Sequence, residues 1–499
     1  AITLAKYRDQ ARNAGTSGYY EQTIVKVWEH YEATLAKEKS LDFDDLLLKT
    51  AMLLKNDETV RAHYQSVWKY IHVDEYQDTN KVQYMIATLL AEKHRNICTV
   101  GDIDQMIYSW RGADIENILN FEKDYPEAKV ILLEENYRST QTILSAANNV
   151  IKKNKMRREK NLFTRNHPGE KIELTVSYTE EEEARVVAEK IRDLIEKGNE
   201  NESGKSAEPV DPREIAILYR ANFQSRVIEE AFIKKNIPYQ VLGTRFFDRK
   251  EVRDVLSFIK ASLNRDSASD LVRIINVPPR GIGKATILKV ISGQGSVGPA
   301  LQAKVNLFTN LLERIKRVAE KESPSELIKY IIRESGMEAT YRAGTAEDHE
   351  KLENLRELVS VAGQYPDIET LLTNTALATD QDQLEKNDRA VKMMTVHASK
   401  GLEFDYVFIT GLETDLFPHK KLDEAEVSES QSEEERRLFY VALTRARKKV
   451  FLNYAQLRTI YGNQKVNAPS EFISDIGDDL IESEVVEEAR GVKAIFIDF

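Results

Sequence analysis

Two adjacent carboxylates, Asp74 and Glu75, directly follow a short apolar run at residues 70–73. Such a run predicts a strand of a buried parallel sheet, and ligands of open α/β sheets bind in the crevice at the carboxyl ends of the strands. Carboxylates there suit nucleotide hydrolysis, in which Asp74 would hold Mg²⁺ and Glu75 would orient and deprotonate the attacking water. For an isolated Asp-Glu pair, a solvated acidic loop is the alternative.

A second polar segment follows the next apolar run, at residues 96–100. Its Gln105 can hydrogen-bond a terminal phosphate or the attacking water. Tyr108 and Trp110, with Arg111 beside them, can offer flat faces to the unpaired bases of a nucleic acid. Taken alone, a Tyr-x-Trp pair is more often packed in a core, so both interpretations stay open at this point.

Three further blocks combine charged and aromatic residues, at Leu133–Thr140, Thr395–Phe404 and Glu434–Ala446. Charge that accumulates on phosphoryl oxygens during transfer needs fixed cations. Arg138 and Arg445 are candidates for that task, although either arginine taken singly is most simply a surface charge.

The elements that must position these residues alternate between short apolar runs and helical periodicity, which predicts an α/β fold with parallel sheets covered on both faces. The chain begins with helical periodicity, and a long helical interval without strand signals at about 243–388 predicts a helical domain inserted into a second α/β domain. We expect strands at residues 70–74, 96–102, 129–133, 172–177, 215–219, 406–410 and 450–453.

The composition indicates a globular protein of about three or four domains, with 499 residues, 41% of them hydrophobic. No run of about 18 apolar residues predicts a membrane span, and a net charge of −11 excludes a uniformly basic nucleic-acid coat protein. The single cysteine, Cys98, cannot form an internal disulfide or a four-ligand thiolate zinc site, which favours a reducing cytoplasm or nucleoid. We expect Cys98 to be buried on its strand.

Taken in order, the five blocks resemble motifs II to VI of the superfamily 1 DNA helicases of the UvrD, Rep and PcrA type, and the resemblance extends from about Leu41 to about Phe472. It implies two RecA-like parallel-sheet domains, the first incomplete, with ATP between them and helical insertion domains. The implied parts are a remnant of the first helical insertion (1–36), the incomplete first RecA-like domain (37–132), the second RecA-like domain (133–242 and 388–482), its helical insertion (243–387) and a C-terminal tail (483–499).

The resemblance also implies a role for each candidate residue, with ATP and Mg²⁺ as cofactors. The residues that act on the nucleotide would be Asp74 at Mg²⁺, Glu75 as the base, Gln105 coupling the γ-phosphate to DNA, Tyr137 on the adenine, Glu403 at the ribose, and Arg138 and Arg445 at the γ-phosphate, with Arg445 as the arginine finger. The residues that contact single-stranded DNA would be Tyr108, Trp110, Arg111 and His397.

The helical interval contains Gly281, Gly283 and Lys284 in a Gly-Ile-Gly-Lys turn. This turn is not a phosphate-binding P-loop, because Pro278 and Ala285 stand where that motif requires Gly and Ser or Thr. Free backbone N–H groups and a nearby lysine suit the backbone of duplex DNA, and the resemblance implies such a contact. A plain helix-start turn is the alternative.

The P-loop of this helicase family, G-x-x-x-x-G-K-[S/T], occurs nowhere in the sequence. The resemblance implies a helicase acting 3′ to 5′ on single-stranded DNA and at single-strand/duplex junctions, which we expect in the cytoplasm. Its P-loop portion is absent here, and a separate chain or a missing segment would supply it. The chain alone should hydrolyse ATP poorly, because the phosphates and Mg²⁺ lose their main cradle. The alternatives are a DNA-binding or interaction fragment without ATP turnover and, more weakly, the helicase-like part of a recombination enzyme.

Overall fold

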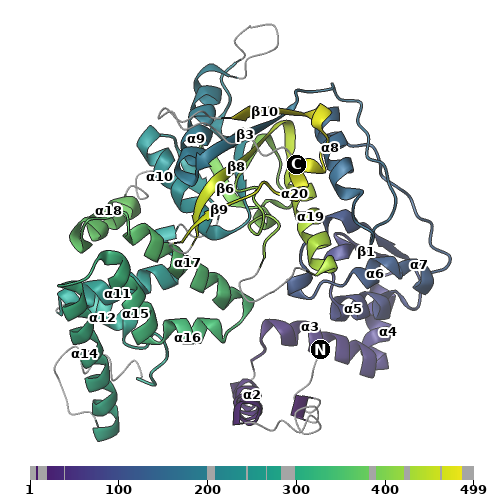
Figure 1. Ribbon diagram of the computed structural model, residues 1–499. Helices are drawn as coiled ribbons and strands as arrows, with labels where there is room; N and C mark the ends of the chain where they lie inside the picture. Colours follow the sequence, from purple (N-terminus) through teal and green to yellow (C-terminus); the bar gives the residue numbers. More distant parts are fainter. Residues whose placement is uncertain are drawn as a thin grey trace. The chain divides into compact units, whose positions relative to one another are not determined.

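The protein is described here from a computed structural model, in which the chain divides into two compact units (Figure 1). The first unit comprises Ala1–Leu133 and Met156–Glu159, and the second comprises Glu134–Lys155 and Lys160–Phe499. The structure describes residues 7–8, 19–38, 40–198, 208–242, 246–265, 267–282, 298–380, 389–420, 428–460 and 463–485. None of the helices within these ranges is both long enough and apolar enough to cross a bilayer.

The first unit contains a short parallel sheet of β1 and β2, joined by a helical crossover. The crossover helix, α5, begins at a capping box in which Asn80 and Gln83 satisfy each other's backbone N–H groups, an arrangement that fixes a helix start. Because the strands are parallel, the segments after β1 and after β2 lie at the same edge of the sheet. The elements of this unit are α2 (Tyr19–Glu38), α3 (Phe43–Asn56), α4 (Glu58–Val67), β1 (Ile71–Val73), α5 (Lys81–Ala91), β2 (Ile97–Thr99), α6 (Ile115–Leu119) and α7 (Phe121–Asp124), with 3-10 turns η1 (Tyr76–Asp78), η2 (Ile103–Gln105) and η3 (Ser109–Arg111).

Two expectations for this unit are wrong. The apolar run at 129–133 is not a strand, and its side chains, including Ile131 and Leu133, are exposed. A run of apolar residues becomes a strand only where a neighbouring strand pairs its backbone, and this run has no such neighbour in the part of the chain that the structure describes. Cys98 lies on β2 as expected, but its side chain is exposed. The described part of the chain leaves this side of the two-stranded sheet uncovered.

The second unit is built on an eight-stranded sheet in which every pairing is parallel except that of β8 with β9. The strand order is β10-β3-β8-β7-β4-β6-β5, with β9 beside β8. All five residues of the central strand β4 are buried, as expected for a parallel sheet that is covered on both faces. The strands are β3 (Ile172–Thr179), β4 (Ile215–Tyr219), β5 (Tyr239–Val241), β6 (Val391–Thr395), β7 (Phe404–Ile409), β8 (Ala446–Ile460), β9 (Asn463–Val466) and β10 (Ile481–Val485).

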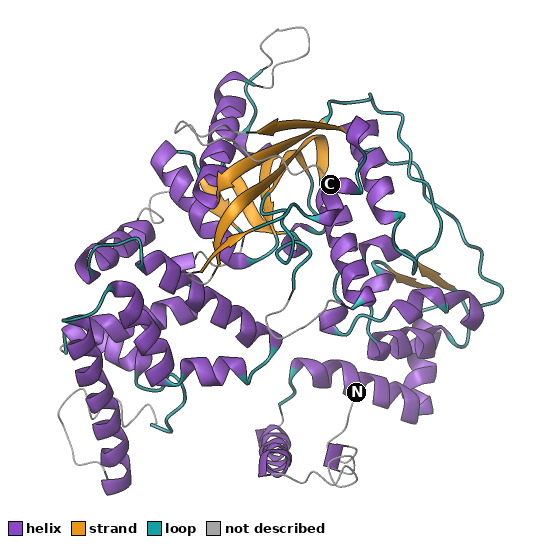
Figure 2. Cartoon of the chain, in the orientation of Figure 1, coloured by secondary structure: helices purple, strands orange, loops and turns teal. Residues whose placement is uncertain are grey.

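Helices cover both sides of this sheet, with α9 and α10 on one side and α8 and α19 on the other (Figure 2). The expected α/β architecture with a covered parallel sheet is therefore confirmed. These helices and the remaining turns are α8 (Gln141–Ile151), α9 (Glu180–Lys197), η4 (Pro212–Glu214), η5 (Asn222–Gln224), α10 (Ser225–Lys235), η8 (His397–Ser399), α19 (Glu429–Leu443), α20 (Glu471–Ser474) and η9 (Asp478–Leu480).

A helical region with its own apolar core is inserted between β5 and β6. Its described residues contain helices and no strand, as the periodicity of this interval predicts. Gly281 has a positive φ of 67°, whereas Gly283 and Lys284 lie outside the described residues. The elements are η6 (Phe246–Asp248), α11 (Lys250–Leu263), α12 (Ala268–Ile274), α14 (Pro299–Ala319), α15 (Pro324–Ser335), α16 (Met337–Arg342), α17 (Ala346–Ala362) and α18 (Ile368–Asp380).

Candidate functional site

The acidic pair of the first unit lies exposed at the carboxyl end of β1. The backbone N–H of Glu75 donates to Oδ1 of Asp74 over 2.9 Å, and Glu75 adopts a left-handed backbone with φ 48°. A non-glycine residue in this region stores backbone strain that the surrounding structure must hold, and such residues cluster at functional sites. The strand end therefore presents two hard oxygen ligands, of the kind that Mg²⁺ prefers.

A buried glutamine, Gln77, links this acidic pair to the segment after β2. Its Nε2 donates to Oε2 of Glu75 over 2.5 Å, and its Oε1 accepts the backbone N–H of Asp102 over 3.0 Å. Gln105 joins the same chain of hydrogen bonds, because its Nε2 donates to Oδ2 of Asp102 over 2.9 Å. The structure thus brings Asp74, Glu75 and Gln105 to one edge of the sheet.

Gly101 leaves room for this link. A Cβ at position 101 would lie 2.6 Å from Oε1 of Gln77, closer than side-chain atoms approach one another. Sequence reasoning did not single out Gln77, although a glutamine beside the acidic pair and a glycine after the next strand were both visible in the sequence.

Tyr108, Trp110 and Arg111 gather at the turn η3. The guanidinium carbon of Arg111 lies 4.8 Å from the ring centroid of Tyr108 and 4.6 Å from that of Trp110, in the range of cation–π contacts. Trp110 is 62% exposed, so it is not a core residue, whereas Tyr108 is half-buried and burial raises the pKa of its phenol. The exposed indole and the cation are suited to stacking on unpaired bases.

A buried ion pair holds the segment after β2, which carries Gln105, Tyr108 and Trp110. Nη2 of Arg157 lies 2.9 Å from Oδ2 of Asp104, and both side chains are almost completely buried. Arg157 comes from the short Met156–Glu159 segment, which returns to the first unit. Sequence reasoning missed this contact, because nothing in the pattern around Arg157 indicates a partner 53 residues earlier.

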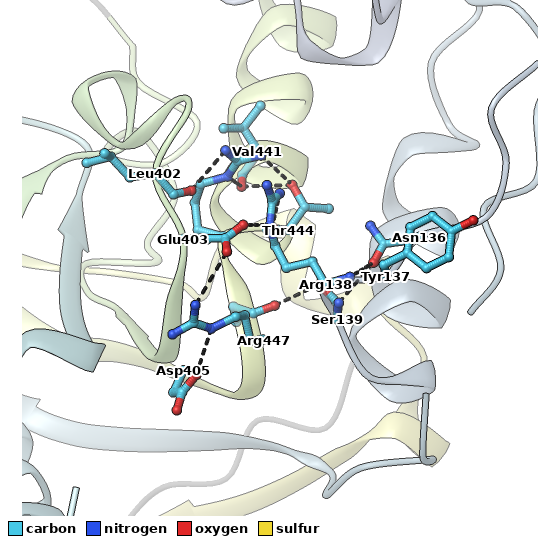
Figure 3. Close-up of polar contacts among 12 residues, drawn as sticks. Asn136, Tyr137, Arg138, Ser139, Leu402, Glu403, Asp405, Val441, Thr444 and Arg447 are labelled. Carbon is cyan, nitrogen blue, oxygen red and sulfur yellow. Dashed lines mark hydrogen bonds and ion pairs between the residues drawn. The ribbon is translucent and has the colours of Figure 1, made fainter. Parts of the chain in front are cut away.

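In the second unit, Arg138 is presented by a turn that Asn136 shapes. Oδ1 of Asn136 accepts the backbone N–H groups of Arg138 and Ser139, over 2.8 and 2.9 Å, as in an Asx turn. The side chain of Arg138 then reaches Glu403, with 2.6 Å between Nε and Oε2, and its Nη1 donates to the carbonyl oxygen of Thr444 over 3.2 Å (Figure 3).

Arg445 lies directly after the carboxyl end of α19 and is only 3% exposed. Its guanidinium donates to the carbonyl oxygens of Val441 and Leu402, over 3.2 and 3.1 Å. A cation at the carboxyl end of a helix is stabilised by the helix dipole. The carbonyl oxygen of Arg445 also accepts the N–H of Phe404 over 2.9 Å, which aligns the starts of β7 and β8.

Glu403 and Arg445 therefore lie at the amino-terminal ends of two neighbouring strands, where Phe404 pairs with Ala446. The hydrogen bond from Arg138 is the main cause that lowers the pKa of Glu403, with a further contribution from the charge of Arg447. Nη1 of Arg447 lies 3.4 Å from Oε1 of Glu403. Arg447 was not identified from the sequence. Arg138 and Arg447 thus both contact the carboxylate of Glu403, and the buried Arg445 lies next to this group.

Tyr137 and His397 differ in their placement. Tyr137 is 80% exposed next to Arg138, and its hydroxyl donates to Oε2 of Glu135 over 3.3 Å. His397 follows the carboxyl end of β6, at the sheet edge opposite to the start of β7, because β6 and β7 both run parallel to β4.

The family models match nearly the whole chain. The model of the UvrD/REP helicase N-terminal domain matches residues 3–126, and that of the UvrD-like helicase C-terminal domain matches residues 131–457. The chain belongs to the UvrD-like helicase family. The resemblance stated from the motifs is thereby confirmed, together with the α/β fold class.

Curated relatives within this UvrD-like helicase family include proteins named ATP-dependent DNA helicase PcrA. The Staphylococcus aureus (strain NCTC 8325) protein is 42% identical over 491 residues, which cover 93% of this chain and 66% of that protein. The Bacillus subtilis protein is 41% identical, with 93% of this chain and 65% of that protein covered. The Staphylococcus epidermidis protein is 40% identical, with 95% and 67% covered. The chain thus spans about two thirds of the length of these relatives.

Proposed function

We propose that this chain is the greater part of an ATP-driven DNA helicase that translocates along single-stranded DNA in the 3′-to-5′ direction. The observation that carries the proposal is the gathering of Arg138, Glu403 and Arg445 at the starts of β7 and β8. Two guanidinium groups beside one carboxylate suit a nucleotide, because the terminal phosphate needs cations and the ribose hydroxyls need an acceptor. The names of the curated relatives support the same activity.

In this proposal, the first unit supplies the residues that activate water. Glu75 orients and deprotonates the attacking water, and Asp74 provides the oxygen ligand for Mg²⁺, which when bound neutralises phosphate charge. The carboxylates at this strand end fit that ion, since hard oxygen donors are its usual ligands. Gln105 senses the terminal phosphate and passes a displacement through Asp102 and Gln77 to Glu75, along the hydrogen bonds that connect them.

The second unit supplies the residues that recognise the nucleotide. Tyr137 stacks its exposed ring on the adenine, Glu403 accepts a hydrogen bond from the ribose, and Arg138 and Arg445 neutralise the charge that develops on the γ-phosphate. The carbonyl oxygens of Val441 and Leu402 hold the guanidinium of Arg445 next to Glu403, and a cation positioned beside the phosphates suits the role of an arginine finger.

The DNA contacts follow from the aromatic and basic residues. Tyr108, Trp110 and Arg111 stack on and neutralise single-stranded DNA, and His397 contributes from the second unit. At a single-strand/duplex junction, the turn with Gly281, Gly283 and Lys284 binds the duplex backbone. When these DNA contacts change with the bound nucleotide, the protein moves along the single-stranded DNA by small steps.

The sequence contains no P-loop, so the chain alone should hydrolyse ATP slowly. A segment outside this sequence, or a separate chain, supplies the missing phosphate cradle. The test measures ATP hydrolysis with and without single-stranded DNA, first on this chain and then on a P-loop-complete protein. The latter restores any upstream coding sequence or, where none exists, carries the P-loop segment of the Bacillus subtilis relative.

The expected result is DNA-stimulated hydrolysis by the P-loop-complete protein, little hydrolysis by the chain alone, and none by a Glu75→Gln control. DNA binding by the P-loop-complete protein without any stimulated hydrolysis would support instead a DNA-binding fragment without turnover.

A further inference from the structure

Arg447 is the centre of an ion-pair cluster beside the candidate nucleotide site. It follows Ala446, the last residue of the Glu434–Ala446 block, and has no role in the function proposed above. Its guanidinium contacts three carboxylates: Nε lies 2.7 Å from Oδ1 of Asp405, Nη1 lies 3.4 Å from Oε1 of Glu403, and Nη2 contacts Glu214. These carboxylates hold the cation in a fixed position. Burial lowers the pKa of Arg447, but the hydrogen bond to Asp405 and the charges of the three carboxylates outweigh it, so the pKa is raised.

Glu403 uses a different oxygen for each of its two cations. Oε2 accepts from Arg138 at 2.6 Å, whereas Oε1 faces Arg447 at 3.4 Å (Figure 3). The carboxylate can therefore lose Arg138 without rotating and without losing its second cation. The side chain of Arg138 is long, and 30% of its surface is exposed, so it can swing away from Glu403 while Arg447 stays pinned by Asp405 and Glu214.

An incoming nucleotide creates a conflict at this place. Arg138 can neutralise a terminal phosphate only by leaving Glu403, and a carboxylate without a cation would then repel the phosphates and draw Arg138 back. We propose that Arg447 is a positioning residue that retains Glu403 when Arg138 transfers to the terminal phosphate of ATP. This inference rests on the proposed function, since it requires that Arg138 bind the γ-phosphate.

A purely structural role is the competing explanation, because Arg447 also joins β8 to the start of β7 through Asp405. The chain offers a matched control for that role. Lys448 is the next cation along β8, and its Nζ lies 2.7 Å from Oδ2 of the same Asp405. Lys448→Met removes the same charge and a contact with the same aspartate, but among the described residues the ion pair of Lys448 is with Asp405 and not with Glu403.

The test measures the binding of a non-hydrolysable ATP analogue and of ADP to the P-loop-complete protein by isothermal titration calorimetry. Arg447→Met should weaken the analogue about 5-fold, the size of a partly exposed ion pair, and should change ADP by less than about 2-fold, because ADP lacks the phosphate that Arg138 binds. Lys448→Met should change neither, and Arg447→Lys should recover part of the loss because it keeps a cation there.

The second arm repeats Arg447→Met in a Glu403→Gln background. A positioning residue that acts through Glu403 should have little further effect there, whereas a structural residue should cost the same in both backgrounds. Equal losses in both backgrounds, equal losses for the analogue and ADP, or no loss in the first background would overturn the inference. If the parent protein binds no analogue at all, the proposed function fails instead, so the two failures are distinguishable.

Discussion

Arg138 and Glu403 are separated by 265 positions in the chain and form an ion pair with 2.6 Å between Nε and Oε2. The pair joins the turn before α8 to the residue before β7, so two parts of the second unit that are far apart in the sequence meet where the family motifs predict a nucleotide. Both side chains remain partly exposed. An exposed ion pair contributes little to stability, so the contact is better understood as a site than as a structural clamp.

Arg445→Ala should abolish turnover while ATP binding persists. Arginine fingers contribute about 10³- to 10⁵-fold to the rate, and the measurement compares kcat with the affinity for a non-hydrolysable analogue in the P-loop-complete protein. Arg437→Ala is the control, because Arg437 is also buried, lies on α19 and pairs with Glu433 over 3.1 Å. If both variants lose binding and turnover equally, Arg445 is a structural arginine and not a finger.

Trp110→Ala should weaken single-stranded DNA binding by about 1 to 3 kcal/mol per stacked base and leave the thermal unfolding temperature almost unchanged, because the indole is exposed. Fluorescence anisotropy with a labelled oligonucleotide measures the affinity. Trp68→Ala is the matched control, since Trp68 is also exposed but stacks on Tyr64 with 4.8 Å between ring centroids. Unchanged affinity in Trp110→Ala would exclude the stacking role.

Gly101→Ala should destabilise the first unit by about 1 to 3 kcal/mol, because the new methyl group would push Gln77 off its buried hydrogen bonds from a distance of 2.6 Å. Urea unfolding followed by circular dichroism measures the loss. Gly298→Ala provides the comparison, because a Cβ there meets nothing within 4 Å. A difference of less than about 0.5 kcal/mol between the two variants would show that Gln77 is not held as described.

The pH dependence of stability should reveal the Arg138–Glu403 pair. The hydrogen bond from Arg138 lowers the pKa of Glu403 below its usual value of 4.5, so the native state favours the carboxylate. The resulting stability is fully present above about pH 4.5 and is lost as the pH falls through the lowered pKa.

Glu403→Gln should remove this part of the acid dependence, which we expect to be no more than about 0.5 kcal/mol because the pair is partly exposed. Urea midpoints of the parent and the variant, compared at pH 7 and at pH 3, measure it. The two proteins should differ less at pH 3. An identical difference at both pH values would contradict a lowered pKa.

The sequence predicts the buried strands best. Residues 172–177 and 215–219 form strands as expected, because short segments rich in branched apolar residues suit a sheet that is covered on both faces. The short strands β5 and β6 were missed, since three to five residues next to a helical insertion carry little periodicity. The run at 129–133 shows the reverse case, in which an apolar pattern forms no strand because no neighbour pairs with it.

The candidate site also contains residues that the sequence predicts and residues that it does not. The motif residues Asp74, Glu75 and Gln105 gather at one sheet edge, as their positions after successive parallel strands predict. Gln77 and Arg447 could not be found in this manner, because their importance comes from partners that only the folded chain brings close. The positions of Gln77 and Arg447 in the sequence match no motif that would indicate a function.

In the proposed function, Asp74 and Glu75 act on the same ATP molecule as Arg138 and Arg445. A crystal structure of the P-loop-complete protein with single-stranded DNA, Mg²⁺ and a non-hydrolysable ATP analogue tests it most directly. We predict that Arg138 and Arg445 contact the terminal phosphate of the analogue and that Asp74 and Glu75 face its Mg²⁺ and attacking water. An analogue bound by one pair of residues, with the other pair on a different surface, would contradict the account.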